Sequence, residues 1–163
     1  MYNYTLTESG AAWIASRISG NGKDLNVLYV VYDNGGKDGI DINKKITVSD
    51  LLALSGTTGV IRVTRNISNT SIPTDTGSFS AVTSGIVSKD DVLSVDGGPE
   101  LNSSSMIISV AVGFTGSGAP DNDVIVAACN LTKDGTSSPV PWVENMTLSV
   151  SCPITISPYP VED

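Results

Sequence analysis

Three aspartates lie close together in a glycine-rich stretch. Of the side-chain groups in the sequence, this one most suggests a binding site for a metal ion. Asp33, Asp38 and Asp41 stand beside Asn34 and Asn43. Clustered carboxylate and amide oxygens can bind Ca²⁺, but this spacing does not match an EF-hand loop, and no acidic residue stands at its bidentate position. Asp33, Asp38 and Asp41 are therefore a weak metal-site candidate. A polar hairpin connection is the favoured interpretation, and we expect no metal or cofactor.

Residue types exclude most catalytic centres. The chain has no histidine, which removes Ser-His and Cys-His pairs and all His-based metal sites. No Ser-x-x-Lys motif occurs, and the glycine-rich stretches 19–22 and 35–39 match neither a phosphate-binding loop nor a dinucleotide-binding motif. Asp90 and Asp91 lie on a predicted turn, and aromatic residues make up only 6% of the chain, too few to suggest the sugar-binding cleft of a glycosidase. We predict that the protein is not an enzyme.

The net charge of the chain indicates which classes of partner it can bind. Asp and Glu number 17 and Lys and Arg 9, a net charge of −8, whereas a nucleic-acid binder needs clustered basic residues. No apolar run reaches the roughly 18 residues of a membrane-spanning helix, and the first residues lack the features of a signal peptide. We expect no nucleic-acid or membrane binding. Synthesis in a reducing cytoplasm favours buried thiols at Cys129 and Cys152, with a disulfide as the alternative.

A short helix is predicted near the N-terminus. Thr7 can cap it, and Gly20 and Gly22 end it. Apolar residues follow the cap at three- and four-residue spacing, and this predicts a face that docks on a sheet: Ala11, Ile14, Ala15 and Ile18. Trp13 lies off this stripe, and two interpretations stay open for it, a core residue on a broad face or an exposed contact residue. A second short helix is predicted by the capping-box pattern Thr47-x-x-Asp50 and the leucines after it.

Strand patterns account for most of the remaining chain. Leu25–Tyr32 is apolar on both alternating sets of residues, as in a strand buried on both faces. Further strands are predicted at 61–67, 79–87, 106–114 and 124–131. In the segment 106–114, every second residue from Met106 to Phe114 is apolar and is expected to line one face. The last strand, Met146–Ile156, alternates apolar residues with Ser and Thr, which is typical of a half-buried antiparallel strand.

These elements predict an α+β fold that is mostly β, an antiparallel sheet or sandwich with two short helices. We expect a single β-rich domain over 1–157 and an extended C-terminal tail over 158–163, since Pro158 and Pro160 favour an extended chain. Pro153 cannot donate to a strand ladder, which places the last strand at a sheet edge or a bulge.

The order of these elements resembles the N-terminal domains of bacteriophage tail-fibre and tail-collar proteins. Thr7-Glu-Ser-Gly10-Ala-Ala-Trp-Ile14-Ala15 matches their pattern T-x-x-G-x-x-x-(I/L)-A, and an apolar strand and a glycine turn, Asp33-Asn-Gly-Gly36, follow. The turn lacks the first glycine of the family's G-D-G. Val124–Asn130 and Met146–Ile156 stand where the family has its last two strands.

The resemblance implies a structural virion protein of the tail or baseplate, made in the host cytoplasm. It would attach or form part of the tail fibre through contacts with other tail proteins, as a homo-oligomer in which a trimer is favoured. The expected interface residues are Trp13, Pro158, Tyr159 and Pro160. Two alternatives stay open, a receptor- or carbohydrate-binding β-sandwich module and a head-decoration protein.

Overall fold

The predicted fold class is confirmed. A computed structural model describes residues 4–155 except 65–66, 76–77, 94–97, 117–119 and 134, with the backbone alone at 71–75, 78–81, 133 and 152–155. Strands hold 41% of the chain and helices 17%, and all paired strands named below are antiparallel. The predicted tail, 158–163, lies outside the described residues.

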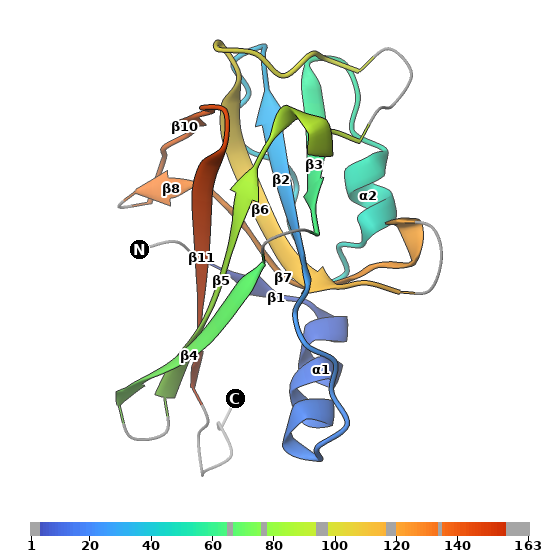
Figure 1. Ribbon diagram of the computed structural model, residues 1–163, viewed down its shortest axis with the longest axis vertical. Coiled ribbons are helices and arrows are strands. Elements are labelled where there is room, and N and C mark those ends of the chain that lie inside the picture. Colours follow the sequence, from blue (N-terminus) through green and yellow to red (C-terminus); the bar gives the residue numbers. More distant parts are fainter. Residues whose placement is uncertain are drawn as a thin grey trace.

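The centre of the fold is a six-stranded sheet with the strand order β1-β7-β6-β2-β3, in which β10 also pairs with the start of β6 (Figure 1). Its strands, in chain order, are β1 (Thr5–Leu6), β2 (Val27–Asp33), β3 (Thr58–Val63), β6 (Met106–Phe114), β7 (Val124–Asn130) and β10 (Val140–Pro141). Every residue of β2 is buried. This agrees with the apolar pattern on both of its faces, because the sheet is covered on both sides.

A bulge in β6 changes which residues share a face. Val31 pairs with Ser109 and Tyr32 with Ile107, so Ile108 is the extra residue. Ile107 therefore joins the same core cluster as Val110 and Val112, while Ile108 joins the opposite cluster. The expectation that alternate residues from Met106 to Phe114 line one face was wrong, because a bulge shifts the period of two by one residue.

One face of the sheet is covered by the helix α2 (Val48–Leu52) and the loop before it. Thr47 and Asp50 form the predicted capping box. Val48 and Leu51 are buried against Tyr29 and Val31 of β2, in a cluster that also holds Ile46. The short helix is thus held by the apolar residues it buries rather than by its own length.

The opposite face is partly covered by a second, three-stranded sheet with the order β11-β5-β4. It consists of β4 (Ser68–Asp75), β5 (Ser78–Val87) and β11 (Met146–Thr155), and we call it the arm. Val87 and Val150 of the arm are buried in the main core. The rest of the arm continues past the lower end of the main sheet (Figure 1).

The helix α1 (Glu8–Ile18) also lies at this lower end (Figure 1). Thr7 caps it as predicted, since its Oγ1 accepts a hydrogen bond of 2.8 Å from the Gly10 amide. The predicted docking face is wrong, however: Ala11, Ala15 and Ile18 are exposed, and Ile18 is 75% exposed. The helix approaches β7 through Gly10 instead, where an added Cβ would stand 2.0 Å from the Val126 carbonyl oxygen.

Short elements complete the described chain: the 3₁₀ turns η1 (Lys89–Asp91) and η2 (Pro120–Asn122) and the pair β8 (Thr132–Lys133) and β9 (Thr136–Ser137). None of the helices in the described part of the chain combines the length and apolar character needed to cross a membrane.

Candidate functional site

The first candidate, Asp33, organises the turn at the end of β2. Its Oδ2 accepts hydrogen bonds from the amides of Gly35 (2.7 Å) and Lys37 (2.8 Å), and its Oδ1 from the hydroxyls of Thr57 (2.7 Å) and Thr58 (3.0 Å). Burial alone would raise the pKa of Asp33, but these four hydrogen bonds together hold the pKa below its usual value. Both oxygens of this buried carboxylate are therefore already engaged by the protein.

The other two aspartates of the candidate metal site do not converge on Asp33. Asp38 and Asp41 are exposed, whereas Asp33 is buried. Within the described ranges, no group of three or more Asp, Glu, Cys or His side chains lies close enough together to hold a metal ion. The clustering in the sequence instead forms a turn with a single buried carboxylate. It is not the hairpin connection that we favoured, because the chain passes through α2 before β3 begins.

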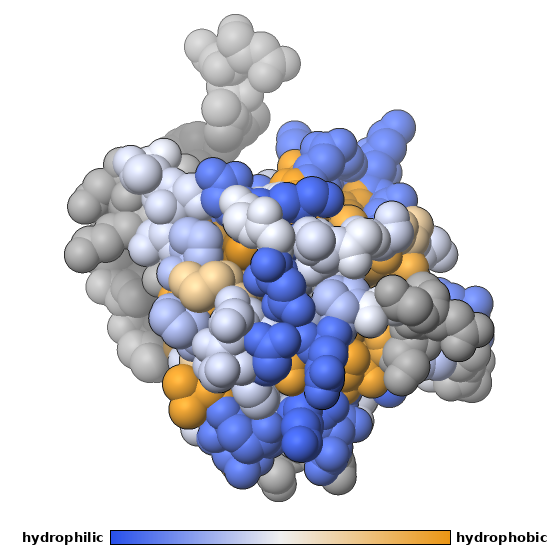
Figure 2. Space-filling model, turned by 90° about the horizontal axis from the view of Figure 1, so that it is seen from above, coloured by the Kyte–Doolittle hydropathy of each residue, from blue (hydrophilic) through white to orange (hydrophobic). Residues whose placement is uncertain are grey.

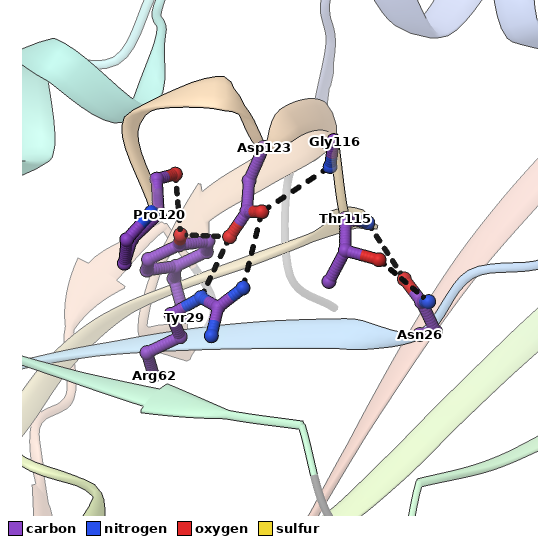
Figure 3. A network of polar contacts seen from close by, with 7 residues as sticks. All are labelled: Asn26, Tyr29, Arg62, Thr115, Gly116, Pro120 and Asp123. Carbon is purple, nitrogen blue, oxygen red and sulfur yellow. Dashed lines mark hydrogen bonds and ion pairs between the residues drawn. The ribbon is translucent and has the colours of Figure 1, made fainter. Parts of the chain in front are cut away.

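A second polar network joins the strands β2 and β3 to the β6–β7 connection and was not predicted (Figure 3). Arg62 on β3 binds both oxygens of Asp123, with Nε 2.7 Å from Oδ2 and Nη2 3.1 Å from Oδ1. The Tyr29 hydroxyl on β2 donates a hydrogen bond to the same Oδ2. The Gly116 amide lies 3.4 Å from Oδ1, so the carboxylate ties both ends of the β6–β7 connection to β2 and β3.

The electrostatics of this network suit a structural clamp. Burial raises the pKa of the Tyr29 hydroxyl, and its hydrogen bond to Asp123 raises the pKa further. The hydrogen bond to Asp123 also raises the pKa of Arg62. Near neutral pH the phenol therefore stays neutral and the guanidinium stays charged, so neither group is adapted to accept or release a proton. One feature of the sequence could have indicated this network: Arg62 is a charged residue between two apolar residues on a strand, and both of these are buried.

A groove lies between α1 and the arm, and we call it the Trp13 groove. Its volume is about 400 Å³, and its lining comes from α1, the segment before β2, and the strands β4 and β5: Trp13, Arg17, Asp24, Leu25, Asn69, Thr70, Val82 and Thr83. Arg17 and Asp24 form an ion pair of 2.9 Å on one side. Asn69 is anchored on the other, because its Nδ2 donates to the Leu25 carbonyl oxygen at 2.5 Å.

Trp13 has features of both interpretations left open by the sequence. Its half-buried ring packs against the edge of the main core and also lines the groove. Its indole Nε1 donates a 2.6 Å hydrogen bond to the Lys23 carbonyl oxygen, which fixes the orientation of the ring. Trp13 thus presents a rigid aromatic surface to the groove. The other expected interface residues, Pro158, Tyr159 and Pro160, lie outside the described residues.

Trp13 is the one aromatic residue among the described residues that line the groove. Tyr29 and Tyr32 are fully buried in the sheet, and Trp142 is 8% exposed. The Trp142 Nε1 has no hydrogen-bond partner among the residues that the structure describes, yet Trp142 does not line the Trp13 groove. The groove therefore offers one aromatic platform.

Comparison with known proteins adds no assignment to these features. A scan of protein-family models, a search of curated proteins and a search of solved structures each found no match to the chain.

Proposed function

We propose that the protein is a structural component of a bacteriophage tail, which attaches the tail fibre to the baseplate or forms part of the fibre. Its function is assembly through protein–protein contacts. The order of helix α1, buried strand β2 and the glycine turn at Asp33 supports the proposal, since it follows the resemblance to tail-fibre N-terminal domains.

The observation that carries the proposal is the outer strand of the arm. β11 lies at the edge of its sheet, and no described strand pairs with its outer side. Its ten residues, Met146–Thr155, include no charged side chain. Edge strands of monomeric proteins are usually protected by charges, prolines or coverage, because their open backbone groups can pair with another chain. β11 has one proline, Pro153, near its end, and no charges. An uncharged edge on a protein of net charge −8 is suited to contact with a second acidic subunit.

Several features that suit assembly lie at the lower end of the molecule. Seen from above, the described surface is largely hydrophilic, and its hydrophobic residues lie in separate small patches (Figure 2). The lower end carries the arm, the Trp13 groove and the exposed Ile18 of α1 (Figure 1). We therefore place the joint at the lower end. Its partners are further copies of the chain, with a trimer favoured by the resemblance, and other tail proteins.

A carbohydrate-binding module is supported less well. Sugar sites usually combine aromatic platforms with convergent polar groups in one cavity. The Trp13 groove contains polar groups but only one aromatic residue, and several of those groups already bind one another, as Arg17 does Asp24 and Asn69 does Leu25.

The proposal is tested by locating the protein in particles. Bacteriophage particles are purified by density gradient and labelled with immunogold, using antiserum against the purified chain. Pre-immune serum is the control. We expect label at the tail or baseplate and the chain among the proteins of the purified particles. Label on capsids would favour a head-decoration protein, and absence of the chain from the particles would refute a virion role.

A further inference from the structure

We propose that Asn21 is a site of self-modification, at which the chain converts this asparagine into aspartate and isoaspartate without an enzyme. The reaction would occur whether or not the protein is part of a phage tail. The chain contains two Asn-Gly pairs, Asn21-Gly22 and Asn34-Gly35. The structure leaves the first pair able to react and holds the second by hydrogen bonds.

The reaction needs only the asparagine, the amide nitrogen that follows it, and water. The Gly22 nitrogen loses its proton and bonds to the side-chain carbonyl carbon of Asn21. The bond from that carbon to Nδ2 breaks, ammonia leaves, and a succinimide ring remains. Water then opens the ring at either of its carbonyl carbons, which gives aspartate or isoaspartate and changes no oxidation state. Glycine favours ring closure, because it has no Cβ to hinder the approach of its nitrogen.

Asn21 and Gly22 lie in the loop that joins α1 to β2. The backbone amide of Asn21 closes the end of the helix by donating a 2.9 Å hydrogen bond to the Ser16 carbonyl oxygen. The Asn21 side chain is exposed. Within the described part of the chain, neither this side chain nor the Gly22 amide has a hydrogen-bond partner. The two reacting groups can therefore approach each other without first breaking a hydrogen bond to a described residue.

The Asn34-Gly35 pair is also exposed, but both of its reacting groups are held. The Asn34 Nδ2 donates a 2.8 Å hydrogen bond to the Glu100 carbonyl oxygen, and its Oδ1 accepts one of 2.6 Å from the Ser105 hydroxyl. The Gly35 amide donates one of 2.7 Å to the Asp33 carboxylate. These bonds must open before a ring can form, and the neighbouring anion makes the Gly35 proton harder to remove.

Packing explains why a glycine follows Asn21. A Cβ added at Gly22 would stand 2.4 Å from the Cδ of Arg17 and 2.9 Å from the Arg17 backbone nitrogen. A larger residue would push the loop away from α1. The close contact between loop and helix therefore requires the glycine that makes Asn21 reactive.

The isoaspartate product would alter the contacts of α1. Its backbone runs through the Cβ of Asn21, so the chain becomes longer between Asn21 and Gly22. Gly22 and Lys23 supply the carbonyl oxygens that accept hydrogen bonds from Arg17, at 3.2 Å, and from the indole of Trp13, at 2.6 Å. We expect the longer chain to displace these oxygens and to release Trp13 from its fixed orientation in the Trp13 groove.

Timed incubation of the full-length chain tests the inference. The folded protein is kept at mildly alkaline pH in water enriched in heavy oxygen. Samples are digested with trypsin in ordinary water, so only residues modified during the incubation carry the heavy isotope. Mass spectrometry then reads the two pairs separately, in the tryptic peptides 18–23 and 24–37.

We expect Asn21 to be modified about ten-fold or more faster than Asn34 in the folded protein, because the hydrogen bonds at Asn34 must open first. Equal rates at the two sites would overturn the inference. An Asn21 that stays unmodified while the denatured chain reacts would overturn it as well.

Denaturant and two variants provide the controls. In denaturant, Asn21 and Asn34 should react at similar rates, because only the folded structure distinguishes them. Asn21→Gln should abolish modification at this position, since glutamine would have to form a larger ring. Ser105→Ala removes a hydrogen bond to Asn34 and should speed the reaction there, while the rate at Asn21 stays unchanged. A rate at Asn34 that stays low in denaturant would contradict protection by the fold.

Hydrogen exchange tests the effect on the helix. After the same incubation, the amides of α1 should exchange faster in the wild type than in Asn21→Gln, which cannot form isoaspartate at this position. Equal exchange in the two chains, once Asn21 of the wild type is modified, would reject the predicted loosening of α1.

Discussion

The guanidinium of Arg62 holds both oxygens of the Asp123 carboxylate, at 2.7 Å and 3.1 Å. The Asp123 side chain is 1% exposed and that of Arg62 is 20% exposed. The pair connects β3 to the segment that leads into β7. The carboxylate also accepts a hydrogen bond from Tyr29. Its removal would leave Arg62 without this ion pair and Tyr29 with only the longer hydrogen bond, of 3.4 Å, to the Pro120 carbonyl oxygen.

Asp123→Ala should therefore destabilise the fold strongly. Breaking a buried ion pair from one side typically costs about 3–5 kcal/mol, and the partial exposure of Arg62 places the expected loss near about 3 kcal/mol. Urea denaturation followed by circular dichroism measures it. Asp121→Ala, an exposed carboxylate in the adjacent turn η2, should change the free energy of unfolding by less than about 0.5 kcal/mol. Similar losses for both variants would contradict a clamp at Asp123.

Asp33 should make the stability depend on pH in the acidic range. The pKa of Asp33 is lowered in the folded protein. The stability that its charged form contributes is therefore complete above the pKa of aspartate in the unfolded chain, about 3.9, and is lost as pH falls through the pKa in the folded protein. At neutral pH, Asp33→Asn should lower the free energy of unfolding by about 2 kcal/mol, the order expected for hydrogen bonds to a charged group.

The difference between the wild type and Asp33→Asn should then shrink below about pH 4. Denaturant unfolding at a series of pH values measures this difference, and Asp38→Asn, which alters an exposed carboxylate nearby, is the control. A difference that stays constant down to low pH would show that the stabilising hydrogen bonds of Asp33 do not require its charge.

Tyr29 should remain protonated where an ordinary tyrosine ionises. Its pKa is raised in the folded protein, so its contribution to stability is complete below about pH 10 and is lost as pH rises through the folded pKa. Near pH 10, folded wild type and Tyr29→Phe should show equal tyrosinate absorbance. In denaturant the wild type should show one more titrating tyrosine. A difference between the two folded proteins near pH 10 would count against a buried, hydrogen-bonded phenol.

The melting temperature should not respond to EDTA or to added Ca²⁺. Four protein donors already bind the carboxylate of Asp33, while Asp38 and Asp41 are exposed and do not converge on it. A ligand raises the melting temperature only when it binds the folded state preferentially. A Ca²⁺-dependent increase that disappears in Asp33→Asn would restore the metal-site interpretation.

The local structure of the chain was readable from its sequence. The bounds of β6, the burial of β2 on both faces and the alternation of the first part of β11 follow from side-chain periodicity. The caps at Thr7 and Thr47 follow from residue type. Each of these features depends on residues that are neighbours along the chain.

Features that depend on contacts between residues far apart in the chain could not be predicted from the sequence. The bulge at Ile108 is defined by the pairing of β6 with β2, and it moved Ile107 to the other face. The network of Arg62 and Asp123 joins residues 61 positions apart. In both cases the deciding contact comes from the tertiary arrangement, which side-chain periodicity does not encode.

The face by which α1 docks was mispredicted for a related reason, and Gly10→Ala tests the explanation. Periodicity favoured the larger apolar residues, but the backbone of α1 approaches β7 at Gly10, where a Cβ would stand 2.0 Å from the Val126 carbonyl oxygen. Alanine is better than glycine in an isolated helix by about 1 kcal/mol, yet overpacking of this kind typically costs about 1–3 kcal/mol. We expect a net loss of stability and faster hydrogen exchange in α1, whereas Ser9→Ala, an exposed change in the same turn, should be neutral. If Gly10→Ala were as stable as the wild type, the helix could dock without this close backbone contact.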